Sequence, residues 1–286
     1  MAVGVMAVSL SGPVMASLSV PALAISFWRN GLATLLIAPA ALVRRRAEIL
    51  GLSRSELGWI LASGVCLAVH FATWVTSLTM TSVASSTAIV CLQIAWVVAW
   101  DRVTGVRLPR KAVVGLVVAF LGVLVITGVD FSVSTRHLMG DLLALTGSIA
   151  VAAYTVIGSR ARRTVTTTSY TFVCYGTAAL LLLLACVVSS RPLVGYDAKQ
   201  WALIGLVTVT AQLLGHSVFN HLLDTISPML VSLALLLEIP GASLLAAAVL
   251  GQVPPVGVFL GLAMILAGMA LVIITGPTQP EETPVS

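Results

Sequence analysis

Residues 57–100 read LGWILASGVCLAVHFATWVTSLTMTSVASSTAIVCLQIAWVVAW and contain no Asp, Glu, Lys or Arg over 44 positions. A second uncharged segment, residues 239–280, is 42 residues long. One helical crossing of a bilayer needs about 20 apolar residues, so each segment can hold two crossings and a tight turn. The two segments therefore predict an all-α integral membrane protein.

The composition of the whole chain agrees with this prediction. Of 286 residues, 59% are hydrophobic and 9% are charged, whereas a soluble domain carries about 25% charged residues. A water-soluble globular enzyme is excluded. The net charge of +5 does not predict a nucleic-acid partner, because the basic residues lie beside apolar segments. The lipid bilayer is the expected partner, and neither a cofactor nor a metal is expected.

Turn residues and charges divide the chain into ten predicted transmembrane helices. Their approximate ranges are 2–18, 22–43, 57–79, 83–100, 111–128, 140–159, 169–189, 200–223, 227–250 and 255–275. Residues 1–28 lack the basic n-region of a secretory signal peptide, so we expect the first helix to be retained. We expect the four cysteines, which all lie in apolar segments, to be packing residues.

The basic residues predict the orientation in the membrane. Arg136, Arg191 and Lys199 fall on one side of the predicted helices, and eleven others fall on the opposite side. Those eleven are Arg44, Arg45, Arg46, Arg54, Arg102, Arg107, Arg110, Lys111, Arg160, Arg162 and Arg163. Because basic loops stay in the cytoplasm, both termini are predicted to be cytoplasmic, in a bacterial inner or plasma membrane. The chain is expected to be a monomer or a homodimer.

The chain also contains an internal repeat. Aligning Trp59 with Trp201 pairs the third helix with the eighth, and the closing helices match as GLVVAFLG from Gly115 and GLAMILAG from Gly261. The predicted repeats are residues 1–129 and 138–276, followed by a disordered cytoplasmic tail at 277–286. With five helices per repeat, the second enters from the opposite side, so an inverted 5+5 repeat with a site at the midplane is predicted. The glycines of the closing helices are expected to allow close helix packing.

Over nearly its whole length the chain resembles the EamA-type carriers of the drug/metabolite transporter superfamily. Three motifs carry this resemblance. They are PALAISFWRNGLATLLIAPAAL from Pro21, GDLLALTGSIAVAAYTVIGSR from Gly140 and SPMLVSLALLLEIPGASLLAAAVLGQ from Ser227. The usual Glu-Pro of the family is Glu238-Ile239-Pro240 in this chain, and the Leu-Gly-Glu ending becomes Leu-Gly-Gln. The resemblance implies a secondary transporter that exports a small metabolite, such as an amino acid or a drug-like solute, with proton or exchange coupling.

Two charged residues fall at bilayer depth, where an ionisable group needs a partner or a water-filled cavity. Arg29 could bind an anionic group of the substrate or form a structural ion pair. Glu238 could be a proton or cation site, or the fixed partner of Arg29. Pro240 removes a backbone donor, so the ninth helix is predicted to kink beside Glu238.

Polar and aromatic residues complete the predicted site. Gln212, His216 and Asn220 follow one another at i, i+4 steps and predict one polar stripe on the eighth helix. In the repeat alignment, Gln212 corresponds to His70 and His216 to Trp74, while Gln93 corresponds to Glu238. His70 and His216 could also be ordinary helix-to-helix hydrogen bonders, Trp74 could be an interfacial anchor, and Tyr154 and Tyr175 are weaker candidates.

Three alternatives to a proton-coupled exporter follow from the same residues. An uncoupled facilitator or exchanger would need no titrating group. An intramembrane enzyme would need a nucleophile, metal ligands or paired acids, and the sequence contains neither HExxH nor GxSxG. A membrane scaffold would not need the polar stripe. The sequence lacks GxxxxGK[ST], so hydrolysis of ATP by this chain is not expected.

Overall fold

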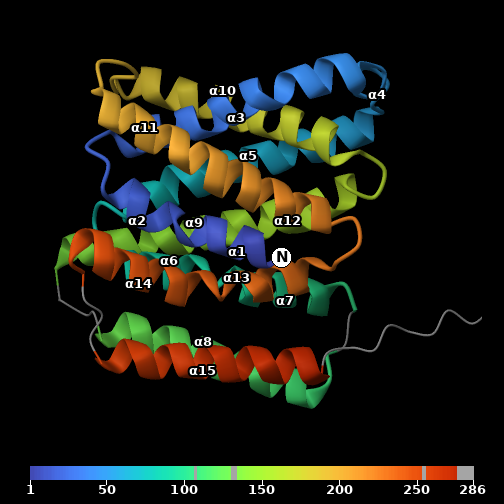
Figure 1. Ribbon diagram of the computed structural model, residues 1–286. Coiled ribbons are helices and arrows are strands. Elements are labelled where there is room, and N and C mark those ends of the chain that lie inside the picture. Colours follow the sequence, from blue (N-terminus) through green and yellow to red (C-terminus); the bar gives the residue numbers. More distant parts are fainter. Residues whose placement is uncertain (106–107, 130–133, 253–255, 276–286) are drawn as a thin grey trace, which may run out of the picture.

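The computed structural model describes residues 1–105, 108–129, 134–252 and 256–275, and these are almost entirely helical (Figure 1). The helices of the first half are α1 (Ala2–Ser9), α2 (Ser11–Ala16), α3 (Ala22–Arg44), α4 (Arg46–Leu50), α5 (Arg54–Ser77), α6 (Val83–Val90), α7 (Gln93–Val103) and α8 (Arg110–Val129). The second half contains α9 (Thr135–Ala161), α10 (Thr167–Val188), α11 (Ala198–Val207), the π-helix η1 (Thr208–His216), α12 (Ser217–Leu222), α13 (Pro228–Leu235), α14 (Glu238–Leu250) and α15 (Val256–Thr275).

Each of the ten predicted spans coincides with helical residues. In the described part of the chain, seven helices are long and apolar enough to cross a membrane. They are Ala22–Arg44, Arg54–Ser77, Val83–Val103, Thr135–Ala161, Thr167–Val188, Ala198–Leu222 and Pro228–Leu250. Ala2–Ala16 and Val256–Val272 are shorter apolar helices. The number of ten crossings stays a prediction, and the tail predicted at 277–286 lies outside the described residues.

Polar caps explain where several helices begin. The side chain of Ser53 accepts a hydrogen bond from the N–H of Glu56, and the Glu56 carboxylate accepts one from the N–H of Ser53. This capping box satisfies donors that the first turn of a helix leaves free. The side chains of Ser82 and Ser227 cap α6 and α13 by accepting a hydrogen bond from the N–H of Ser85 and of Leu230.

The two halves are related by an inverted two-fold arrangement. Helices α6 and α7 form one interrupted span and α13 and α14 another, and α6 contacts α14 while α7 contacts α13. These equivalent spans therefore run antiparallel. A second pair of contacts shows the same relation. In the two repeats α5 is equivalent to η1 and α1 to α9, and α5 contacts α9 just as η1 contacts α1. Antiparallel equivalent helices require an axis perpendicular to the helices, as in inverted-repeat transporters.

The interruptions of the two spans match residue for residue. Helices α6 and α13 each have eight residues, each is followed by two non-helical residues, and α7 and α14 begin at Gln93 and Glu238. The Sγ of Cys91, in the first interruption, donates to the carbonyl oxygen of Leu235 at 3.4 Å, so the first interruption contacts the end of α13 next to the second. Pro240 lies in the first turn of α14, where its missing N–H is tolerated.

Glycines hold α8 and α15 together. A Cβ atom built on Gly122 would lie 2.6 Å from the carbonyl oxygen of Gly261, and one on Gly115 would lie 2.6 Å from that of Gly268. The two helices therefore approach backbone to backbone, as predicted for these glycines. Cys91, Cys174 and Cys186 are buried and Cys66 is half-buried, and all four are free thiols.

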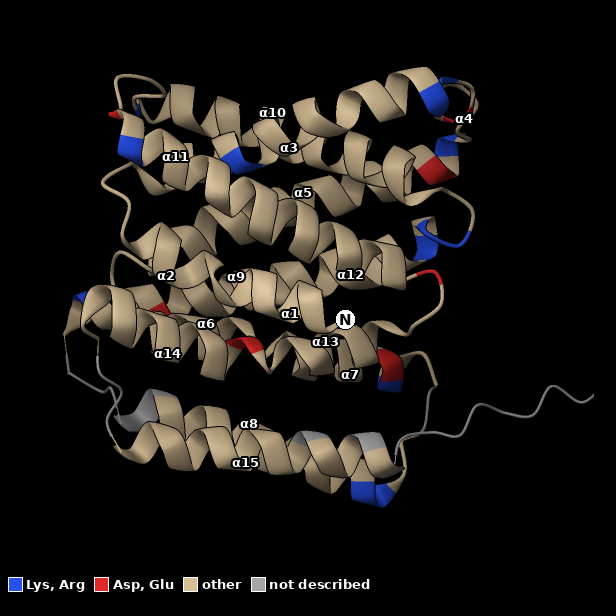
Figure 2. Cartoon of the chain, viewed as in Figure 1, with Lys and Arg blue, Asp and Glu red and all other residues tan. Residues whose placement is uncertain are grey.

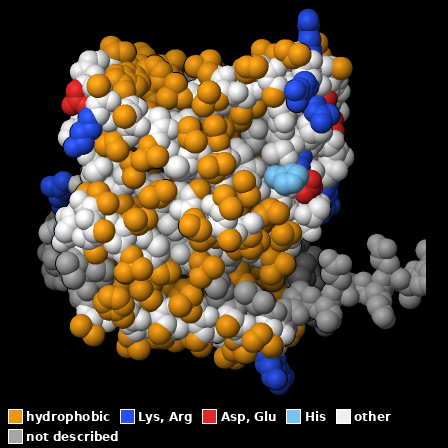
Figure 3. Space-filling model, in the orientation of Figure 1, with side chains coloured by type: hydrophobic (Ala, Val, Ile, Leu, Met, Phe, Trp, Pro, Cys, Tyr) orange, Lys and Arg blue, Asp and Glu red, His pale blue; other side chains and the backbone are white. Residues whose placement is uncertain are grey.

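Charged residues gather at the two ends of the helices, with isolated exceptions along their middle (Figure 2). Apolar side chains cover much of the face between those ends (Figure 3). At one end, the Glu48 carboxylate accepts hydrogen bonds from Thr166 N, Thr166 Oγ1 and Ser169 Oγ. Desolvation opposes ionisation of Glu48, but these hydrogen bonds and the charge of Arg45 outweigh it and lower the pKa of this carboxyl. These hydrogen bonds join α4 to the start of α10.

Candidate functional site

A small cavity lies between the two halves at the level of the interruptions. It measures about 40 Å³, enough for a few water molecules. Seven of the nine predicted site residues line it: His70, Trp74, Gln93, Tyr154, His216, Asn220 and Glu238. Arg29 and Gln212 lie beside it rather than in its wall. Both repeats therefore supply one shared, enclosed site.

Glu238 is the acidic group of this cavity. It is the first residue of α14 and its side chain is 7% exposed. The described residues provide no hydrogen bond and no ion pair to its carboxylate; the ion pair that they do form joins Arg162 to Asp224. The start of α14 favours negative charge there through the helix dipole. Glu238 is therefore a buried acid in the cavity wall that forms no hydrogen bond or ion pair in the described part of the chain.

Gln93 is the counterpart of Glu238 in the first repeat. It begins α7 as Glu238 begins α14, and it is 4% exposed. Its Oε1 atom is buried and accepts no hydrogen bond from the described residues. One repeat thus places a neutral amide, and the other an acid, at equivalent positions.

Arg29, on α3, is held by neutral groups of α2, α5 and η1. Its Nε donates to Gln212 Oε1 at 2.9 Å, and its guanidinium lies 4.0 Å from the centre of the Phe71 ring. Nη1 contacts the sulfur of Met15 at 3.4 Å, and Nη2 is buried without a partner among the described residues. The side chain is fully buried. The ion pair with Glu238 that the sequence left open is not formed.

The structure corrects the regular polar stripe predicted for the eighth span. Residues Thr208–His216 form a π-helix, whose i→i+5 hydrogen bonds widen the turn. Gln212 consequently faces α3, where its Nε2 donates to Asn30 Oδ1 at 3.1 Å, while His216 and Asn220 face the cavity. The i, i+4 argument assumed an α-helix, and the π-helix divides the three side chains between two environments.

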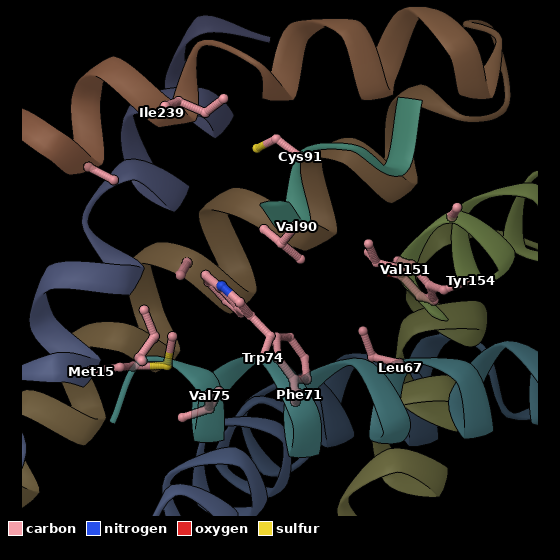
Figure 4. Packing of buried hydrophobic residues seen from close by; sticks show 14 of the residues in the cluster. Met15, Leu67, Phe71, Trp74, Val75, Val90, Cys91, Val151, Tyr154 and Ile239 are labelled. Carbon is pink, nitrogen blue, oxygen red and sulfur yellow. The ribbon is translucent and has the colours of Figure 1, made fainter. Parts of the chain in front are cut away.

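Aromatic rings form one wall of the cavity. His70 stacks on Trp74 with ring centres 5.4 Å apart, and His216 lies 6.3 Å from His70 and 6.1 Å from Tyr154. His70 Nδ1 donates to the carbonyl oxygen of Gly147 at 3.0 Å, which leaves Nε2 as the free ring nitrogen. Trp74 points from α5 toward Val90 at the end of α6 and Cys91 in the interruption (Figure 4). Trp74 is 3% exposed and its Nε1 lacks a partner, so it is not an interfacial anchor.

A chain of hydrogen bonds connects Tyr154 to the residues around Arg29. Tyr154 OH donates to Asn220 Oδ1 at 2.7 Å, and Asn220 Nδ2 donates to Tyr175 OH at 3.1 Å. The Tyr175 hydroxyl reaches Ser217 Oγ at 3.1 Å and the Gln212 carbonyl at 3.5 Å. A fully paired polar network of this kind fixes side-chain positions. Tyr154 and Asn220 are thus held rigidly, unlike Glu238.

Arg162 lies next to the site and contacts the backbone of Asn220. It follows α9, and its Nε donates to the backbone oxygen of Asn220 at 2.9 Å while Nη2 lies 3.0 Å from Asp224 Oδ2. Nη1 donates to the carbonyl oxygen of Val165. The guanidinium is almost fully buried. It joins the end of α9 to the turn between α12 and α13.

Sequence reasoning missed several of these contacts. Asn30 could have been found, because it is polar and adjoins Arg29 in an apolar span. Arg162 was counted as a loop charge, and only the fold brings it to Asn220. Phe71 carries no sequence signal as a neighbour of a charge. Among the described residues, no group of three His, Cys, Asp or Glu side chains could hold a metal ion.

Comparisons with known proteins agree with this geometry. The family model of the EamA-like transporter family matches residues 1–128 and 138–274, which are the two halves described above. A solved structure titled only "Crystal structure of protein" is similar with a TM-score of 0.74 and 17% sequence identity, covering 96% of this chain and 94% of that one. This likeness shows the fold alone. No curated protein sequence matches. The chain belongs to the EamA-like transporter family and is a multi-pass membrane transporter.

Proposed function

We propose that this protein is a secondary transporter that exports a small metabolite, such as an amino acid or a drug-like solute, with a proton gradient as the source of energy. The observation that carries the proposal is Glu238, a buried acid that lines the cavity and forms no hydrogen bond or ion pair with the described residues. A carboxyl group in this position can take up and release a proton as the cavity opens to either side. Family membership accounts for transport of small solutes, and Glu238 supplies the coupling.

The cavity has the size expected of a closed intermediate. Sites for small molecules measure about 300–1,000 Å³, whereas this one measures about 40 Å³. A metabolite can enter only after the helices separate. The interruptions before Gln93 and Glu238 are suited to this movement, because they let each half-helix tilt separately.

Arg29 supplies positive charge beside the cavity. Its Nη2 has no partner in the closed arrangement, and an unpaired buried donor is unfavourable. We propose that the guanidinium binds an anionic group of the substrate when the cavity opens. Transport of a carboxylate-bearing solute would use Arg29 and Glu238 for different tasks, with one binding the solute and the other carrying the proton.

The proposal is tested with purified protein in liposomes and a mixture of ¹⁴C-labelled amino acids. We expect an imposed pH gradient to cause accumulation, and Glu238→Gln to abolish this accumulation while leaving exchange of labelled for unlabelled solute. Asp101→Asn, which changes an acid of α7 outside the cavity wall, is the matched control and should behave as the wild type.

Two results would contradict the proposal. If the uptake of labelled solute is the same with and without the pH gradient, and the same in Glu238→Gln, an uncoupled facilitator or exchanger would be favoured. Product formation from a labelled lipid or peptide without solute flux would favour an intramembrane enzyme.

We also propose that both termini face the cytoplasm, in a bacterial inner or plasma membrane. The predicted loop charges support this, because eleven basic residues fall on one side and three on the other. A fusion of alkaline phosphatase to the C-terminus should be inactive, and a fluorescent protein fused there should fluoresce. The reverse result would place the basic end outside.

A further inference from the structure

A second and larger cavity lies between α7 and α8, away from the transport site. It measures about 530 Å³ and opens on the side of the bundle. Its lining is apolar apart from Arg102 at one end. The other end is formed by Leu92 and Leu236, which belong to the two helix interruptions. We call this cavity the lateral groove.

The length of the lateral groove matches one leaflet of a bilayer. Arg102 and Leu92 are ten residues apart, and a rise of 1.5 Å per residue makes the groove about 15 Å long. On α8 the lining residues Val113 to Val123 span the same length. The hydrocarbon core of a bilayer is about 30 Å thick. The groove thus runs from the level of the head groups to the midplane.

The positive charge at the Arg102 end of the groove indicates which ligand the groove binds. Arg102 lines the groove there, and Arg110 and Lys111 begin α8 one turn before Val113. Basic pockets between transmembrane helices on the cytoplasmic side bind anionic head groups. An apolar space of this size at membrane depth does not hold water stably, because water there would find few polar partners.

We propose that the lateral groove binds one anionic phospholipid, with an acyl chain between α7 and α8 and the phosphate at Arg102. The end of the acyl chain would then contact Leu92 and Leu236, which lie in the interruptions just before Gln93 and Glu238. The lipid would fill the space between the α8–α15 pair and the rest of the bundle. This proposal does not depend on the transported solute or on proton coupling.

The test measures lipid retention by native mass spectrometry of the full chain. The protein is reconstituted with dioleoyl phosphatidylglycerol or with dioleoyl phosphatidylcholine and released into mild detergent. We expect one retained phosphatidylglycerol per chain and at least a fivefold lower retention of phosphatidylcholine. Arg102→Ala should lower phosphatidylglycerol retention to the same degree. Arg54→Ala, a basic residue at the start of α5 outside the groove, should not.

A second variant tests the acyl-chain site. Ala99→Trp places a large side chain inside the groove and should abolish retention, whereas Leu184→Trp on the exposed face of α10 should not. Unchanged retention in Arg102→Ala or in Ala99→Trp would overturn the proposal. So would a dimer that Ala99→Trp dissociates, because a second copy of the chain would then occupy the groove.

The wild-type protein alone provides a measurement that does not depend on variants folding. Its thermal stability in detergent should rise on addition of phosphatidylglycerol, but not on addition of phosphatidylcholine or inorganic phosphate. Equal effects of the two lipids would show that the head group is not recognised. An effect of inorganic phosphate alone would show that the basic end binds anions without an acyl chain.

Discussion

Arg29 and Glu238 are both buried at bilayer depth, but the protein treats them differently. Arg29 is surrounded by Gln212, Phe71 and Met15, so its guanidinium contacts an amide oxygen, the face of a ring and a sulfur atom. Glu238 has no comparable support among the described residues. An ionisable group inside the membrane needs a partner or a cavity, and Arg29 has the former whereas Glu238 lies at the latter.

Gln212 should be the residue that keeps Arg29 in place. Replacing it by leucine removes the acceptor of the Arg29 Nε and the donor to Asn30. Leaving a buried hydrogen-bond donor without its acceptor costs about 1–3 kcal/mol, and more when the donor is charged. We expect Gln212→Leu to lower the melting temperature in detergent by several degrees. Gln200→Leu should change it little, because Gln200 accepts from Ser19 N at an exposed position. Equal losses would contradict this role for Gln212.

At the scale of elements, the interrupted spans show that the repeat, and not proline, sets where the helices break. The second interruption is followed by Pro240, but the first has no proline and falls at the same place. Glycine has a clearer local role in α8 and α15. Each close approach of these helices occurs where one backbone meets a residue without a Cβ atom.

The glycine contacts lead to a prediction about α8. Gly122→Ala would place a methyl group 2.6 Å from the Gly261 carbonyl oxygen, so the helices must separate and the protein should lose stability. A Cβ atom at Gly205, on α11, would have no other atom within 4 Å. Gly205→Ala should therefore leave the stability unchanged or raise it by up to about 1 kcal/mol through helix propensity. Thermal unfolding in detergent compares the two variants. Stabilisation by both would show that α8 and α15 do not pack as described.

At the scale of the whole molecule, the Arg162 contacts join one end of the helix bundle to the small central cavity. Arg162 joins the end of α9 to Asn220 and Asp224, and Asn220 also belongs to the cavity wall. One side chain therefore connects the end of the bundle to the central site. Opening at this end requires these contacts to break.

Asp224→Asn should make the cavity more accessible from this end. The measurement uses Thr155→Cys, a cavity residue, in a chain whose four native cysteines are replaced, and follows its reaction with a charged methanethiosulfonate. We expect reaction to become several times faster from the Arg162 end, because a neutral amide holds the guanidinium less strongly. Asp197→Asn at the start of α11 is the control. Equal rates in the two variants would show that the ion pair does not close the site.

The sequence by itself determined the helical membrane architecture, because long uncharged segments can be stable only in lipid. It also determined the repeat and seven residues of the cavity wall, since polar groups in apolar spans are few and the alignment pairs Gln93 with Glu238. The tertiary structure alone decided which of them meet. The π-helix turned Gln212 toward Arg29, and packing kept Arg29 from pairing with Glu238. Such contacts depend on backbone register and on neighbours far apart in the chain, which local periodicity does not encode.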